Sequence, residues 1–289
     1  LFSLIYPSHF SRRMRAIMDS MHTIQKGNYD QKVNVGGNDE LTLLASEFND
    51  LTERLQNSEE KRRRFVSDAS HELKTPLASI KLLTDSILQN DMDADTMREF
   101  VEDIGSEAER LNRMTAKLLS LTKVDGQPLP EAELIRMAPT IRQVAKMLNP
   151  VAKKSGISLE LELDGDSTVL ITRDDLYQIV FNLMENGIKY NRPGGTVSVT
   201  LSRSMDLAKL TVADTGMGIP EEALSHIFER FYRVDKARSR QTGGSGLGLA
   251  IVRAIVSRNR GEIRVDSQVG VGTRFYVTFP IFDTEVDAT

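Results

Sequence analysis

The chain has 289 residues, of which 40% are hydrophobic and 27% are charged, and its formal net charge is −4. This length favours two or more domains, and the composition is ordinary for a soluble globular protein. The lack of cysteine excludes disulfides and thiolate metal sites, and the acidic balance gives no support to a nucleic-acid-binding surface.

The first seven residues, Leu1 to Pro7, are mostly apolar, and the chain begins without Met. No apolar run in the sequence is long enough to cross a bilayer. We expect residues 1–7 to be the end of a transmembrane helix, so that the rest of the chain lies on the cytoplasmic side of a cell membrane. An ordinary apolar terminus is the alternative.

Two amphipathic helices are predicted next, joined by a polar connector that contains Gly27 and the alternating Val33 and Val35. Their apolar residues are spaced by three and four: Phe10, Met14, Ile17, Met21 and Ile24 in the first, and Leu41, Leu44, Phe48, Leu51 and Leu55 in the second. Two short helices cannot bury these stripes alone. We therefore expect them to pair with a second copy of the chain.

The second helix is predicted to continue without a break to about Gln89. A coiled-coil seam runs through Val66, Ser70, Leu73, Leu77, Ile80, Thr84 and Ile87. From Leu55 to Val66 is eleven residues, a stutter that changes the supercoil locally. His71 falls one position past a seam residue and should point outward, where a solvated surface histidine is the ordinary interpretation.

After a turn at residues 90–93, a return helix is predicted, with a seam at Met97, Val101, Ile104, Ala108, Leu111, Thr115, Leu118 and Thr122. Two such hairpins form a four-helix bundle in a dimer. Residues 125–130 are predicted to be a linker to a separate domain.

From about residue 131 the pattern becomes α/β. Helices are predicted around residues 141–148 and from Asp174 through Tyr190. Strands are predicted at residues 157–163, 169–172, 197–201, 207–213, 262–266 and 273–279. Moderate helices and alternating strands favour a two-layer α/β sandwich.

Several polar and glycine-rich segments of this domain could form one nucleotide pocket. Asn182 and Asn186 share a helix face, with Lys189 further along, and an amide oxygen suits Mg²⁺ whereas an ammonium suits phosphate. Asp214 follows an apolar strand, where a buried carboxylate can accept from the exocyclic amine of adenine. Gly243–Leu249 opens an apolar helix whose amides can hold phosphate, although it is not a Walker A loop.

Between these glycine segments lies Phe228-Glu229-Arg230-Phe231-Tyr232-Arg233, followed by a polar tract with Arg238 and Arg240. We interpret it as a mobile lid. Phe228 and Phe231 would anchor this lid, and an arginine would reach the terminal phosphate of a nucleotide.

Together these motifs resemble the HAMP-containing sensor histidine kinases of two-component systems. Ser70 to Leu77 closely resembles their H-box, and Asn182 to Tyr190 their N-box. The N-box departs at Gly187, where alanine is usual and where glycine costs up to ~1 kcal/mol of helix stability. Pro7, Gly27 and Asp39-Glu40 resemble a HAMP domain, and the glycine segments complete a Bergerat-type ATP-binding fold.

The resemblance implies four regions: a transmembrane remnant at residues 1–7, a HAMP signal-relay domain at 8–58, a dimerisation and histidine-phosphotransfer hairpin at 59–125, and a catalytic ATP-binding domain at 131–283. The expected fold is therefore all-α dimeric bundles followed by an α/β two-layer sandwich.

The resemblance also implies the chemistry. His71 would attack the γ-phosphate of Mg-ATP, Glu72 would take the imidazole proton, and the phosphoryl group would pass to an aspartate of a response regulator. Thr75 would orient water for dephosphorylation of that regulator, or merely prepare a bend at Pro76. Asn186 would bind Mg²⁺. The residues expected to contact ATP are Asn182, Asn186, Lys189, Tyr190, Asp214, Gly216, Gly218, Ile219, Phe228, Arg233, Gly244, Gly246, Leu247 and Gly248.

Two other functions remain open at this point. An ATPase of the same nucleotide fold would use hydrolysis to drive conformational change, and it would give His71 and Glu72 no role. A non-catalytic dimeric scaffold would leave the ATP-site residues without a role.

Overall fold

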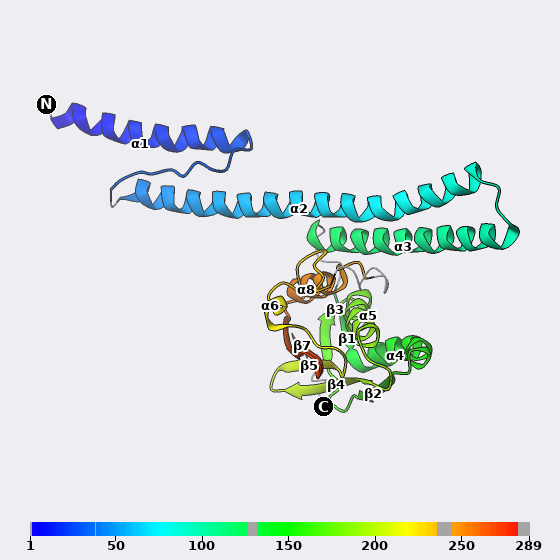
Figure 1. The fold of residues 1–289 in the computed structure, drawn as a ribbon. Helices are drawn as coiled ribbons and strands as arrows, with labels where there is room; N and C mark the ends of the chain where they lie inside the picture. Colours follow the sequence, from blue (N-terminus) through cyan, green and yellow to red (C-terminus); the bar gives the residue numbers. More distant parts are fainter. Residues whose placement is uncertain (1, 38, 127–131, 236–243, 283–289) are drawn as a thin grey trace. The chain divides into compact units, whose positions relative to one another are not determined.

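The computed structural model describes residues 2–37, 39–126, 132–235 and 244–282. The chain divides into two compact units, Leu1–His71 and Glu72–Thr289. The elements follow one another in the predicted order, with long helices first and an α/β region after them (Figure 1).

The first unit contains helix α1 (Phe2–Gln25) and the start of helix α2 (Glu40–Gln89). Its core joins both helices and the connector through Ile17, Val33, Val35, Leu41 and Ala45. The Asn49 side chain donates to the Val33 carbonyl and accepts from the Val33 amide, both at 2.9 Å. The extended connector is thereby held against α2 by hydrogen bonds from the Asn49 side chain to its backbone, as well as by its valines.

Asp39 fixes the beginning of α2. Its carboxylate accepts from the Thr42 amide at 3.2 Å, as an N-cap residue does, and from the Arg13 guanidinium at 2.6 Å. The hydrogen bond from Arg13 lowers the pKa of Asp39 far below its usual value. One carboxylate therefore caps α2 and ties it to α1.

Helix α2 is continuous through Pro76, as the unbroken pattern predicts, and Thr75 keeps a helical conformation. Helix α3 (Ala94–Gly126) returns after residues 90–93, and the Asp93 side chain caps it by accepting from the Thr96 amide at 2.8 Å. The predicted hairpin is therefore confirmed. Within the described residues, no helix is both long and apolar enough to cross a membrane.

The α/β region contains a five-stranded sheet in the order β2-β4-β5-β7-β6 and a two-stranded sheet β1-β3. The β2–β4 pair is parallel and the other pairs are antiparallel. The strands are β1 (Glu133–Arg136), β2 (Ser158–Glu162), β3 (Thr168–Ile171), β4 (Thr196–Ser204), β5 (Leu207–Asp214), β6 (Glu262–Gln268) and β7 (Gly272–Pro280). Strand β1 was not predicted.

Helices α4 (Met137–Lys154), α5 (Arg173–Lys189) and α8 (Gly248–Arg258) pack against the five-stranded sheet (Figure 1). A short helix α6 (Glu221–Leu224) follows β5. Alternate residues of β4, β5 and β7 are buried, so one face of the sheet forms the core beneath the helices. The predicted two-layer sandwich is confirmed.

A buried ion pair joins α5 to α8. Arg258 donates to both carboxylate oxygens of Asp175 at 2.6 and 2.7 Å, and Asn259 donates to the same carboxylate at 3.2 Å. Thr172 caps α5 by accepting from the Asp175 amide at 3.1 Å. The start of α5 is therefore fixed to the end of α8.

The last turns of α3 pack on the sandwich through contacts with α8. Met114 and Leu121 of α3 are buried, with 3% and 1% of their surfaces exposed. Ser120 and Gln178 of α5 exchange hydrogen bonds at 2.6 and 3.0 Å. The sequence pattern gave no indication of this contact, because Met114 and Leu121 lie one position before the predicted seam residues.

Candidate functional site

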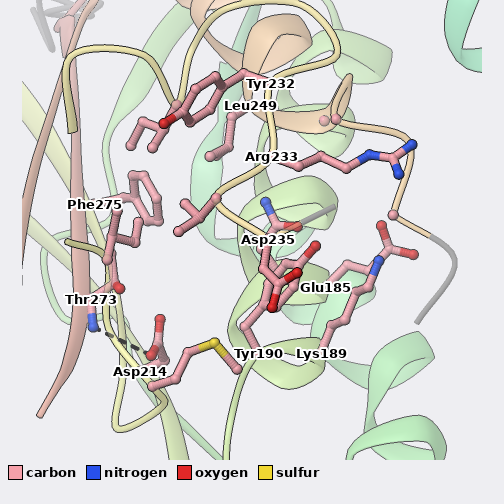
Figure 2. A pocket seen from close by; sticks show the side chains of 18 of the residues that line it. Glu185, Lys189, Tyr190, Asp214, Tyr232, Arg233, Asp235, Leu249, Thr273 and Phe275 are labelled. Carbon is pink, nitrogen blue, oxygen red and sulfur yellow. Dashed lines mark hydrogen bonds between the residues drawn. The ribbon is translucent and has the colours of Figure 1, made fainter. Parts of the chain in front are cut away.

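A cavity of about 280 Å³ lies in the second unit, among α5, the ends of β5 and β7, and the segments before and after residues 236–243 (Figure 2). Ten of the residues predicted to contact a nucleotide line it: Asn186, Lys189, Tyr190, Asp214, Gly218, Ile219, Arg233, Gly244, Gly246 and Gly248. The fold thus brings together residues that are up to 62 positions apart in the chain.

Asp214 ends strand β5 opposite Thr273 of β7. Its Oδ1 accepts from the Gly216 amide at 2.8 Å and from the Thr273 amide at 3.3 Å (Figure 2). Burial raises the pKa of Asp214, and the two amides oppose that shift. The backbone therefore holds the carboxyl group in place, so that it can accept from an amine such as that of adenine.

Gly218 shows why this loop needs glycine. Its φ is +70°, and a Cβ there would lie 2.1 Å from the carbonyl oxygen of Gln268. Any side chain would separate the loop from β6, so glycine lets the backbone close this end of the cavity.

The C-terminal turns of α5 supply the opposite wall. Burial lowers the pKa of Lys189 to about 8, while Glu185 raises it and Lys117 and Arg233 lower it further. Burial also raises the pKa of Tyr190. Figure 2 shows Lys189 and Arg233 across the cavity from Asp214 and Thr273, so the cationic groups and the half-buried carboxyl group of Asp214 lie on different sides.

Four predicted contact residues do not line the cavity: Asn182, Gly216, Phe228 and Leu247. The Asn182 side chain is buried and donates to the Gln178 carbonyl at 2.7 Å. A Cβ at Gly248 would lie 2.9 Å from its Oδ1, so Asn182 packs directly under the start of α8. Its contact with a nucleotide stays a prediction.

Gly187, where the sequence departs from the N-box pattern, packs against β4. A Cβ at this position would lie 3.1 and 3.2 Å from the two methyl groups of Val197. The departure therefore accommodates a close approach of α5 to the sheet and leaves the cavity residues unchanged.

The predicted lid is described as far as residue 235, and Arg238 and Arg240 lie outside the described residues. Phe228 meets the ring of Phe275 edge to face, with 6.4 Å between the ring centroids. Arg233, whose side chain is only 6% exposed, forms an ion pair with Glu72 of α2. The predicted phosphate-binding arginine is thus bonded to the predicted proton acceptor.

The three residues predicted to carry out phosphoryl transfer and its reversal, His71, Glu72 and Thr75, lie on α2. His71 is an exposed residue at the end of the first unit, whereas Glu72 and Thr75 belong to the second. Glu72 is half-buried, and Thr75 is exposed.

Sequence reasoning missed several residues of the cavity wall, among them Lys117, Glu185, Ser245, Leu249, Thr273 and Phe275. Ser245 is notable because its Oγ is buried and has no hydrogen-bond partner among the described residues. Its place between two glycines of the predicted phosphate loop was a usable signal. The sequence held no comparable signal for Lys117, because this residue is one of many charged residues on an amphipathic helix.

The described residues contain no group of three or more His, Asp or Glu side chains that could hold a metal ion. Asn186 contributes an amide to the cavity wall. A hard cation bound here would take its other ligands from oxygens of a bound molecule or from water.

Family models match three consecutive segments of the chain. Residues 8–57 match the HAMP domain, and residues 61–127 match the His Kinase A (phospho-acceptor) domain. Residues 171–282 match the histidine kinase-, DNA gyrase B- and HSP90-like ATPase. The last match contains most of the cavity wall.

Similar proteins include the sensor-like histidine kinase SenX3 of Mycolicibacterium smegmatis, which is 36% identical over 76% of this chain and 57% of its own length. The sensor histidine kinase YkoH of Bacillus subtilis is 34% identical over 92% of this chain and 58% of its own. A crystal structure of full-length ShkA in complex with AMPPNP aligns with a TM-score of 0.56 and 26% identity, covering 75% of this chain and 46% of that one. The chain thus spans little more than half the length of these curated relatives.

Proposed function

This chain belongs to the HAMP-containing sensor histidine kinases, and we propose that it phosphorylates its own His71 with ATP and passes the phosphoryl group to a response regulator. One observation carries the proposal: an exposed histidine lies in the segment that matches the phospho-acceptor model, and the same chain contains a cavity in the segment that matches the ATPase model. A scaffold would need neither feature.

The cavity residues suit ATP. The half-buried Asp214 carboxyl group fits the exocyclic amine of adenine, and Lys189 and Arg233 on the opposite side fit phosphate. The orphaned Ser245 hydroxyl would gain a partner from a phosphate oxygen, which removes the cost of leaving it unpaired. We propose that Asn186 holds Mg²⁺ by its amide oxygen; the ion supplies charge neutralisation of the phosphates when bound.

In the proposed reaction, the unprotonated imidazole nitrogen Nε2 of His71 attacks the γ-phosphorus. The new P–N bond replaces the bond to the bridging oxygen, and ADP leaves. Glu72 accepts the Nδ1 proton, which raises the nucleophilicity of the imidazole. Its Oε2 accepts from Arg233 in this structure, so Oε1 is the oxygen proposed for the proton.

The phosphoryl group then passes to an aspartate of a receiver domain docked on the hairpin, with the P–N bond breaking as the P–O bond forms. Thr75 follows His71 by one helical turn, so the two share a helix face. A hydroxyl there can orient a water molecule toward the aspartyl phosphate, which gives the reverse, phosphatase activity.

The proposed assembly is a homodimer at the cytoplasmic face of a membrane. The His Kinase A match and the exposed seam residues on α2 and α3 support a dimer, and the HAMP match supports relay from a membrane. We retain the domain bounds 8–58, 59–125 and 131–283 as proposals.

The deciding experiment compares His71→Gln with His22→Gln, a change at another exposed helical histidine. With γ-labelled ATP, we expect the unchanged chain and His22→Gln to incorporate phosphate that is stable in alkali and lost in acid. His71→Gln should incorporate none while still binding ATP. Labelling of His71→Gln would show that the acceptor is elsewhere, and ATP turnover without labelled protein would instead indicate an ATPase.

A further inference from the structure

One cation of the cavity wall comes from the hairpin and has no assigned role. Lys117 of α3 lines the cavity together with residues of the α/β sandwich. Its Nζ lies 3.5 Å from Glu185 Oε2 of α5, and 29% of its side chain is exposed. The phospho-acceptor hairpin therefore supplies part of the nucleotide site.

The backbone of Lys117 is held firmly. It lies between Met114 and Leu121, and these positions share one helical face by their spacing of three and four. Both of these neighbours are buried, and Ser120 exchanges hydrogen bonds with Gln178 of α5. The lysine is thus presented to the cavity by a packed helix, whereas its long side chain can still change partner.

The surrounding charges indicate which partner it would take. Among the described residues of the cavity wall, Lys117 joins two other cations, Lys189 and Arg233. The latter two face Asp214 across the cavity in Figure 2. A nucleotide whose adenine meets Asp214 extends its phosphate chain toward the cationic side. Glu185 is then in competition with phosphate oxygens for Lys117.

We propose that Lys117 is a nucleotide-binding residue, which contacts the phosphate chain of ATP from α3. This inference rests on the proposed ATP site. The ammonium group exchanges the carboxylate of Glu185 for phosphate oxygens, and bound ATP thereby joins the sandwich to α3. Loss of nucleotide removes that link, while the Ser120–Gln178 bonds remain.

The test is a calorimetric titration of the whole chain with ATP and, separately, with adenosine. Lys117→Ala should weaken ATP binding about tenfold, as expected for the loss of one charge-assisted hydrogen bond, and should leave adenosine binding unchanged. Lys117→Arg, which keeps the charge, should recover most of the ATP affinity. Arg113→Ala is the matched control, because it removes an exposed cation of α3 outside the cavity.

Unchanged ATP affinity in Lys117→Ala would overturn the inference. Equal weakening of ATP and adenosine would also overturn it, because that result shows support of the pocket rather than contact with phosphate. Either outcome leaves the proposed function standing if the unchanged chain binds ATP. Failure of the unchanged chain to bind ATP would overturn both.

Discussion

At the scale of single residues, burial shifts Asp214, Lys189 and Tyr190 of the cavity wall toward their neutral forms. It raises the pKa of Asp214 and lowers the pKa of Lys189 to about 8. Both shifts have the same cause, since a charged group is less well solvated in the cavity wall than in water. A bound phosphate would compensate this cost at Lys189, because it favours the ammonium form.

We therefore expect ATP binding to depend on pH near neutrality. The pKa of Lys189 is lowered, so its ammonium group loses its proton as pH rises through about 8, and a phosphate contact is lost with it. Between pH 7 and pH 9 the affinity for ATP should fall by up to about tenfold, one pKa unit. Titration calorimetry at both pH values measures this fall.

The variant Lys189→Arg distinguishes deprotonation of Lys189 from the titration of other groups as the cause of the weaker ATP binding. Arginine stays charged over the same range, so the fall between pH 7 and pH 9 should be much smaller in that variant. An equal fall in both proteins would assign the pH dependence to another group.

At the scale of elements, the two helices that border the cavity are joined at their far ends. Asp175 and Arg258 link α5 to α8, with 10% and 13% of their side chains exposed. At the other end of this contact, Asn182 packs under Gly248, where α8 begins. The ion pair thus helps to set the distance between Asn186 on α5 and the glycine-rich segment before α8.

Arg258→Ala should destabilise the second unit by about 3 kcal/mol, because it leaves the Asp175 carboxylate buried without its main partner. Urea unfolding followed by circular dichroism measures the change. Arg264→Ala is the control, since Arg264 and Glu262 form a pair whose side chains are 74% and 62% exposed. This control should lower the free energy of unfolding by less than about 0.5 kcal/mol. A similar loss of stability in both variants would contradict the role of the buried pair.

At the scale of the whole molecule, the hairpin leaves apolar side chains uncovered in a single chain. Leu77 of α2 and Val101 of α3 are 51% and 56% exposed, and both belong to the predicted seams. A seam that repeats over several heptads is the pattern by which helices pack together, so these residues favour a bundle formed with a second copy.

Val101→Asp should weaken the proposed dimer, because the charge would have to be buried in the bundle. Sedimentation equilibrium should then give the mass of one chain, 32.3 kDa, at concentrations where the unchanged chain gives twice that value. Met205→Asp is the control, since Met205 is 90% exposed and lies between β4 and β5. A monomeric unchanged chain would refute the dimer, and a dimeric Val101→Asp would remove Val101 from its interface.

The sequence by itself determined the order and type of nearly all elements. Heptad spacing in α2 and α3 and alternation in β4, β5 and β7 are local periodicities, and in the strands the alternation follows from one buried face of the sheet. The strand β1 was missed because only two of its four residues, Leu134 and Ile135, are apolar, whereas three of the four residues of β3 are apolar. Several of the segments that line the cavity were also predicted, since glycine-rich turns and the Asn186 helix are local patterns.

Only the tertiary structure decided which side chains of those segments reach the cavity. The Asn182 side chain packs under the start of α8, whereas Asn186, one helical turn later, lines the cavity. Lys117 joins that wall because α3 packs against α8 and Ser120 bonds to Gln178 of α5, and Arg233 meets Glu72 from 161 residues away. Such contacts depend on how helices and sheet pack over long separations in the chain, and no local period encodes them.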